Sequence, residues 1–256
     1  MSVSDYFTNP LVMLAYSLRN RKSRTRHLDF LRDMDKSQFY NSEQLQEMQT
    51  AKLRRAVRNA FRYSSFWQKR FTNIGLKEED IENLTSTQGL PELTREDVIN
   101  CKDEIVSKAF ATSELIENVS GGTTGSSLSY YLTKHRIDIR TASTLRHNLW
   151  TSYRIGDKLA TVWGAPDDIA SQKPLKTKVR EMLWGKSIDF NSNILTDESL
   201  RSFELEWDKF RPDILLAYSG ALNFFVNHAK DLKLSFASPR AIITSAEVLT
   251  PEARKN

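Results

Sequence analysis

Cysteine and long apolar runs are nearly missing from this chain of 256 residues. The single cysteine, Cys101, excludes an internal disulfide framework and fits a reducing compartment, so we expect a cytoplasmic protein. Its charged surroundings, INCKDEI, favour a half-buried thiol over a nucleophile. No apolar run approaches the roughly 20 residues that a membrane-spanning helix needs. With 39% hydrophobic and 27% charged residues, the composition predicts a globular protein with one large domain or two small ones.

Most of the chain has no excess of positive charge. Residues 1–60 hold 11 Lys and Arg against 6 Asp and Glu, whereas residues 61–256 hold 26 of each sign. The net charge of +5 therefore belongs to the N-terminus. Because the rest of the chain lacks the basic excess expected for nucleic-acid binding, we predict that nucleic acid is not a partner.

The N-terminal charge follows an apolar run. Residues 11–26, LVMLAYSLRNRKSRTR, place five Lys and Arg between Arg19 and Arg26, after the apolar residues. A signal peptide has the opposite order, with its positive charge first. Two interpretations stay open: a helix packed on its own domain with a solvated basic end, or an amphipathic segment on an anionic membrane surface. The second makes residues 11–26 a peripheral membrane contact.

Residues 1–110 have helical patterning. Asn41 and Gln44 form the pattern of a capping box, which predicts a helix that continues to about Tyr63. The aromatic stretch SSFWQKRFTNI predicts a short helix ended by Gly75. We therefore expect a helical N-terminal region that packs through apolar faces.

From about residue 128 the pattern changes to strands that alternate with helices. This alternation is typical of βαβ units, so we predict an α/β fold in which residues 111–256 form a largely parallel sheet with right-handed crossovers. The predicted strands are 128–133, 158–164, 187–195, 213–218 and 241–249. The predicted helices are 137–153 (closed by Gly156), 176–185, 197–210, 220–232 (capped by Ser219) and one opened by Thr250, Pro251 and Glu252.

Glycine is scarce, with nine residues, yet three of them lie within residues 121–125. The stretch SGGTTGSSLS, residues 120–129, also contains six Ser and Thr residues. Glycine lets the backbone approach a ligand closely, and consecutive N–H groups and hydroxyls suit phosphate oxygens, so this stretch is a candidate phosphate loop. Two known loops do not fit. The Walker loop needs a longer glycine spacing and a lysine, and the dinucleotide loop needs glycine where Ser120 stands.

The stretch SGGTTGSSL resembles the S-S-G-T-T-G-x-P-K loop of adenylate-forming enzymes, which include acyl-CoA synthetases, luciferases and peptide-synthetase adenylation domains. In that family the loop wraps the β- and γ-phosphates of ATP. Three positions depart from the motif: Gly121 stands where Ser is usual, Ser127 replaces the proline and Leu128 replaces the lysine. The resemblance implies a nucleotide-binding set made of Ser120, Gly121, Gly122, Thr123, Thr124, Gly125 and Ser126.

The resemblance extends over residues 50–256. The stretches AFRYSSFWQKRFTNIGL, RIGDKLATVWG, RPDILLAYSGAL and PRAIITSAEVLTPEARKN follow the order of the phenylacetate–CoA ligase-like branch, which includes capsular-polysaccharide-biosynthesis members. It implies activation of a carboxylate by ATP as an acyl-adenylate, followed by transfer to CoA or another acceptor. Glu247 matches a Gly-Glu position near the acyl pocket of that branch, although as a strand-end carboxylate it has an equally good structural interpretation.

The family's Y-G-x-[ST]-E segment, which contains a magnesium-binding Glu, does not occur before residue 256. We therefore expect an incomplete N-terminal domain of a longer enzyme, inactive alone, with its Mg²⁺ site mostly outside this chain. The alternative is a non-catalytic, truncated member that acts as a binding or membrane-surface scaffold. Neither the acyl substrate nor the catalytic residues follow from the sequence.

Other candidate residues have ordinary structural interpretations. We predict that His147 and His228 are packed or surface residues and that Asp167 and Asp168 form a solvated turn. Ser219 lacks the G-x-S-x-G context of a nucleophile, so we expect it to cap the helix that follows. No two His or Cys have the spacing of metal ligands, so no metal site is predicted from these residues.

Overall fold

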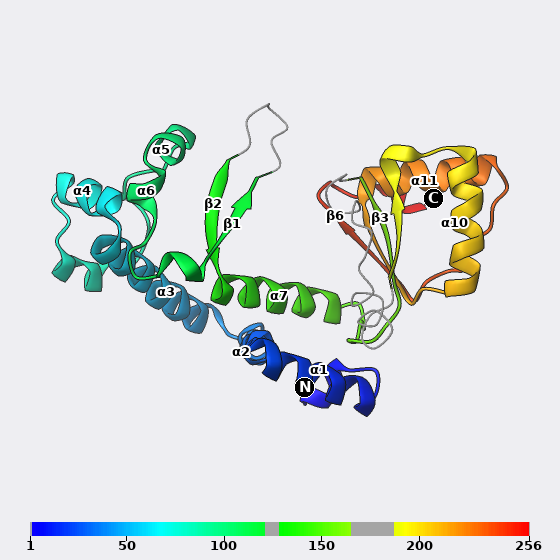
Figure 1. Cartoon of the computed structure of the whole chain (residues 1–256), viewed down its shortest axis with the longest axis horizontal. Helices are drawn as coiled ribbons and strands as arrows, with labels where there is room; N and C mark the ends of the chain where they lie inside the picture. Colours follow the sequence, from blue (N-terminus) through cyan, green and yellow to red (C-terminus); the bar gives the residue numbers. More distant parts are fainter. Residues whose placement is uncertain (1, 121–127, 165–186, 256) are drawn as a thin grey trace. The chain divides into compact units, whose positions relative to one another are not determined.

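The computed structural model describes residues 2–120, 128–164 and 187–255 (Figure 1). The chain divides into two compact units. We call Arg26–Ser143 the hairpin unit and Met1–Thr25 with Thr144–Asn256 the sheet unit. The division predicted at residue 110 stays a prediction, because it rests on a change of sequence pattern rather than on compactness. Among the described helices, none has the length and apolar character needed to cross a membrane.

The hairpin unit begins with helices. Asn41 Oδ1 accepts a hydrogen bond from the backbone N–H of Gln44, and Gln44 Oε1 accepts one from the backbone N–H of Asn41. This reciprocal pair confirms the predicted capping box and starts the longest helix of the unit. Gly75 has a φ of +76° and follows the aromatic helix, as predicted. The helices are α2 (His27–Ser37), α3 (Ser42–Tyr63), α4 (Ser65–Asn73), α5 (Arg95–Asn100) and α6 (Lys102–Ile105), with 3-10 turns η2 (Glu78–Asn83) and η3 (Thr112–Glu114).

Buried apolar side chains join α3, α4 and η2. Val57, Phe71 and Ile81 form a cluster in which each is at most 6% exposed. Trp67 stacks on Phe71 with ring centroids 5.4 Å apart. The apolar stripe of α3 therefore packs as its helical spacing predicted.

Two antiparallel strands follow these helices in the hairpin unit. β1 (Leu115–Val119) pairs with β2 (Ser129–Thr133), with Val119 opposite Ser129. The sequence predicted β2 but not β1. The stretch LIENV has polar residues in its second half and only two half-buried positions, so it lacks the clear alternation by which a strand is recognised. The pairing places the glycine-rich stretch between two antiparallel strands.

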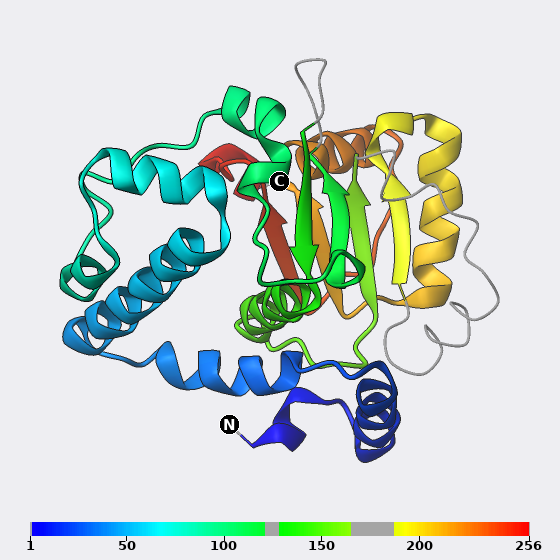
Figure 2. The same ribbon diagram turned by 60° about the vertical axis from the view of Figure 1, so that its left-hand side comes forward.

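The sheet unit contains a four-stranded parallel sheet with the order β4-β3-β5-β6, shown in Figure 2 from β4 (yellow) to β6 (red). This confirms the predicted α/β class. Two predicted strands end early: a 3-10 turn, η4 (Ser192–Ile194), follows β4, and Ala246 has a φ of +68° just after β6. The strands are β3 (Leu159–Trp163), β4 (Ser187–Asn191), β5 (Ile214–Tyr218) and β6 (Ala241–Ser245).

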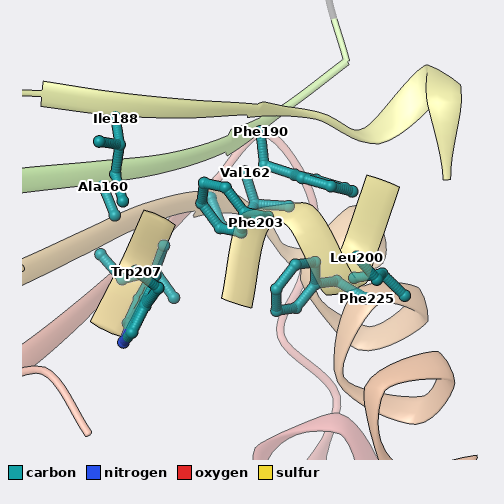
Figure 3. Packing of buried hydrophobic residues seen from close by; sticks show 10 residues of the cluster. Ala160, Val162, Ile188, Phe190, Leu200, Phe203, Trp207 and Phe225 are labelled. Carbon is teal, nitrogen blue, oxygen red and sulfur yellow. The ribbon is translucent and has the colours of Figure 1, made fainter. Parts of the chain in front are cut away.

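Helices α10 (Asp197–Phe210) and α11 (Ser219–Asp231) pack on the sheet through aromatic side chains (Figure 3). Phe203 lies within 5.0–6.3 Å, between ring centroids, of four other aromatic rings. These rings belong to Phe190, Trp207, Phe225 and Phe236. The core of this unit therefore depends on rings supplied by β4, α10, α11 and the segment that follows α11.

Three further helices occur among the described residues. α1 (Pro10–Ser23) follows the short turn η1 (Val3–Tyr6). α7 (Lys134–Leu149) starts and ends earlier than predicted, because Ser152 with a φ of +62° leads the chain into a turn before Gly156. α12 (Pro251–Lys255) starts where predicted, with Thr250 Oγ1 accepting from the backbone N–H of Ala253. The helix predicted at 176–185 lies outside the described residues.

Candidate functional site

The β1–β2 hairpin closes the base of the glycine-rich loop. The backbone N–H of Ser120 donates to the carbonyl of Leu128 at 2.8 Å, and the backbone N–H of Leu128 donates to Ser120 Oγ at 2.9 Å. Ser120 thus holds the two ends of the loop together. The other predicted phosphate-binding residues, Gly121, Gly122, Thr123, Thr124, Gly125 and Ser126, lie outside the described residues.

Lys102 ties α6 to both strands of this hairpin. Its Nζ donates to Glu117 Oε1 at 2.9 Å and to Ser129 Oγ at 2.7 Å, and lies 4.6 Å from the centre of the Tyr131 ring. The hydrogen bond to Glu117 raises the pKa of Lys102, and the same contact lowers the pKa of Glu117. The sequence did not indicate Lys102, because nothing in KDEI shows that its side chain contacts residues 15 and 27 positions later.

The parallel sheet has one point where its strand order reverses. The chain leaves β3 for β4 on one side and then crosses to β5 on the other side of β3. In open α/β sheets, ligands bind outside the carboxyl ends of the strands at such a switch point. The carboxyl edge between β3 and β5 is therefore the candidate binding edge of the sheet unit.

Two aromatic rings mark this edge. Trp163, the last residue of β3, stacks on Tyr218, the last residue of β5, with centroids 3.8 Å apart and planes 28° apart. Next to Trp163, the carbonyl of Gly164 accepts from the side-chain amide of Asn193, which lies beyond β4. The edge thus combines a flat aromatic surface with polar groups, a mixture common in small-molecule sites.

Glu247 lies at the same edge and contacts the start of α11. Its Oε2 accepts from the backbone N–H of Gly220 at 2.6 Å, so the carboxylate satisfies one of the free N–H groups of that helix. A Cβ at position 220 would come too close to this oxygen, so a larger residue there would require the Glu247 side chain to move.

The cap predicted for Ser219 is wrong. Tyr218 is the N-cap residue, and it makes no side-chain cap. The Ser219 hydroxyl is buried, at 3% residue exposure, with no hydrogen-bond partner among the described residues. Glu247 takes the place expected for the serine, because the bend after β6 brings its carboxylate onto the helix end.

Ser219 also lines a cavity of about 580 Å³ in the sheet unit. Its walls are mainly apolar and come from α11, the two strands β5 and β6, and the segments on either side of β6. Lys230 and Arg254 also line it. The cavity therefore has mainly apolar walls with a few polar groups, and one of these groups, the Ser219 hydroxyl, follows the carboxyl end of β5.

The remaining candidates have structural partners or lie outside the described residues. His228 Nε2 lies 2.7 Å from Asp197 Oδ1 at the start of α10, and His147 stacks on Trp150 with centroids 5.7 Å apart. Asp167 and Asp168 fall in the segment that the structure does not describe. Over residues 2–120, 128–164 and 187–255, no three His, Cys, Asp or Glu are placed to hold a metal ion.

The contact of Glu247 with α11 leads to a stability prediction. Replacing Glu247 by Ala should lower the free energy of unfolding by about 0.5–1 kcal/mol, because the helix loses an acceptor and a negative charge at its N-terminus. Glu247→Gln keeps an accepting oxygen and should lose less. Urea unfolding measures both. Glu206→Gln, at an exposed position inside α10, is the matched charge control, and a Glu247→Ala midpoint equal to that of the unchanged protein contradicts the contact.

No protein-family model matches the sequence, and no curated protein matches it. Solved structures of 2-hydroxyisobutyryl-CoA ligase do match. An open conformation, in complex with 2-HIB-AMP and CoA, aligns at 14% identity over 80% of this chain and 45% of the ligase, with a TM-score of 0.57. A postadenylation state with 2-HIB-AMP aligns at 13% identity over 75% and 40%, with a TM-score of 0.54.

The chain spans less than half the length of the ligase structures that it matches. At such low identity the likeness establishes architecture rather than activity. The sheet order, the helices on the sheet and the extent of the alignment together show that this chain has an α/β fold similar to part of 2-hydroxyisobutyryl-CoA ligase.

Proposed function

We propose that this protein takes part in the ATP-dependent activation of a carboxylate as an acyl-adenylate, followed by transfer of the acyl group to CoA or another acceptor. One observation supports this most: a loop rich in glycine and hydroxyls is closed by a hairpin, in a chain with the fold of part of a ligase solved with 2-HIB-AMP and CoA. The phenylacetate–CoA ligase-like branch is the finer assignment, and it rests on the sequence resemblance.

The loop would hold the β- and γ-phosphates of ATP. By composition, its glycines can leave backbone N–H groups accessible and its threonine and serine hydroxyls can donate to phosphate oxygens, so the donor types fit a polyphosphate. Ser120 and Lys102 act at the base, where they fix the spacing of the two strands. The protein's contribution at this step is positioning and neutralisation of charge rather than covalent chemistry.

The carboxyl edge of the sheet would receive the carboxylate substrate. The stacked rings of Trp163 and Tyr218 offer apolar surface for a carbon skeleton. In this proposal Glu247 positions the start of α11 beside the substrate through its contact with Gly220. Mg²⁺, when bound, supplies positive charge to the phosphates, and we assign no described residue to it.

Exchange of labelled pyrophosphate into ATP, driven by a panel of carboxylates, tests the proposal with the product of the complete reading frame. Exchange that depends on one class of carboxylate is the expected result, because formation of an acyl-adenylate is reversible. The panel includes 2-hydroxyisobutyrate and phenylacetate. Exchange with the first would favour a substrate like that of the structural neighbour, and exchange with the second would favour the phenylacetate–CoA ligase-like branch. An absence of exchange with every carboxylate, from a folded protein, would favour the non-catalytic scaffold instead.

A further inference from the structure

Helix α1 in the sheet unit has a buried face and an exposed face. Tyr16 and Asn20 are buried, at 8% and 9% exposure. On the opposite side Leu11, Leu14 and Leu18 are 79%, 57% and 57% exposed. Their spacing of three and four residues places the three leucines in one stripe along the helix. The stripe is therefore an apolar surface that the described residues leave open.

The orientation of α1 is fixed by the segment before it. The backbone N–H of Ile155 donates to the carbonyl of Tyr6 at 2.8 Å, and the backbone N–H of Thr8 donates to the carbonyl of Ile155 at 3.1 Å. Phe7 packs edge-on against Tyr16 with ring centroids 5.5 Å apart. Burial raises the pKa of Tyr16, which agrees with a desolvated inner face. Because the inner face is held in this way, the leucine stripe points outward.

Positive charge continues the stripe at its C-terminal end. Arg21 and Lys22 lie three and four residues beyond Leu18, so they fall on the same side of the helix, and both are exposed. Arg24 follows in the left-handed conformation, with a φ of +50°, and is exposed as well. No Asp or Glu occurs between residues 6 and 28. The exposed face of α1 thus combines apolar side chains with a basic end that has no acidic residue close to it in the sequence.

We propose that this face of α1 docks on an anionic lipid surface. Leu11, Leu14 and Leu18 enter the boundary between headgroups and acyl chains, while Arg21 and Lys22 contact lipid phosphates. Binding of a helix at a lipid surface increases with the apolar area that it buries and with its attraction to anionic lipids, and α1 supplies both an apolar stripe and a basic cluster. The charge favours anionic lipid over a second copy of this chain, whose own α1 has the same sign.

Co-sedimentation tests the proposal with the full chain. One set of vesicles contains equal parts of phosphatidylcholine and phosphatidylglycerol, and the other contains phosphatidylcholine alone. We expect binding to the anionic vesicles that weakens with salt. Arg21→Gln with Lys22→Gln should weaken it roughly 25-fold, since each basic residue near the surface contributes about fivefold. Leu14→Ser with Leu18→Ser should weaken it by about tenfold or more.

Matched controls lie on α10 of the same unit. Arg201→Gln with Lys209→Gln removes the same charge, and Leu205→Ser removes an apolar side chain that is 64% exposed. Neither should change vesicle binding. Equal, negligible binding to both kinds of vesicle overturns the proposal. The protein could also sediment without lipid, and the leucine variant could lose this sedimentation. That result would show that the stripe binds a second copy of this chain, and it would also overturn the proposal.

Discussion

Replacing Thr124 by Ala should lower carboxylate-dependent pyrophosphate exchange by roughly 10- to 150-fold. This range corresponds to the loss of one charge-assisted hydrogen bond, about 1.5–3 kcal/mol, from a hydroxyl to a phosphate oxygen. Gly125→Val should lower the exchange further, because a β-branched residue cannot follow the backbone conformations that glycine permits. The measurement is the exchange rate at saturating carboxylate, together with the affinity for ATP.

Two variants serve as controls for the loop. Thr124→Ser keeps the hydroxyl and should retain most of the exchange. Thr112→Ala, at an exposed position just before β1, removes a hydroxyl outside the loop and should have no effect. If Thr124→Ala and Gly125→Val both exchange at the unchanged rate, the loop does not bind phosphate. Loss of exchange in Thr124→Ala and Thr112→Ala alike would indicate a general loss of structure.

Replacing Phe203 by Ala should lower the free energy of unfolding of the sheet unit by about 3–5 kcal/mol. Phe203 is 4% exposed and lies among four aromatic rings. Figure 3 shows three of these rings, those of Phe190, Trp207 and Phe225. Its removal loses the transfer free energy of the ring and leaves a cavity that the remaining rings fill only in part. Urea unfolding followed by tryptophan fluorescence reports the change, since Trp207 packs against Phe203.

The control for this variant is on the same helix. Leu205→Ala removes a side chain that is 64% exposed, and the expected change is within about 0.5 kcal/mol. Phe203→Leu retains an apolar side chain and should fall between the two. Equal midpoints for Phe203→Ala and Leu205→Ala would show that the aromatic cluster does not support the sheet.

Much of the secondary structure follows from local chemistry. The capping box of Asn41 and Gln44 starts α3 at the predicted residue, and the predicted helix 197–210 has the observed ends. Both depend on contacts within one helical turn, which the sequence contains in full. The parallel sheet follows from the alternation of strands and helices, because parallel neighbours need crossover connections.

Less of the candidate site than of the secondary structure could be predicted from local sequence. β1 was missed because its short stretch gains strand character only by pairing with β2. Lys102 was missed because its partners lie across the hairpin. The loop residues were indicated by composition and resemblance alone, and except for Ser120 they lie outside the described residues.

Ser219 and Glu247 show which features of this protein the sequence determined and which only the tertiary structure decided. The sequence determined that a helix follows the strand ending at Tyr218, since an apolar run gives way there to helical spacing. The sequence did not determine which group accepts a hydrogen bond from the free N–H groups at the start of that helix, because this depends on which residues lie nearby in space. Only the fold decided it: β6 lies beside β5, and the bend at Ala246 brings the Glu247 carboxylate to the Gly220 N–H, 27 residues away in the chain.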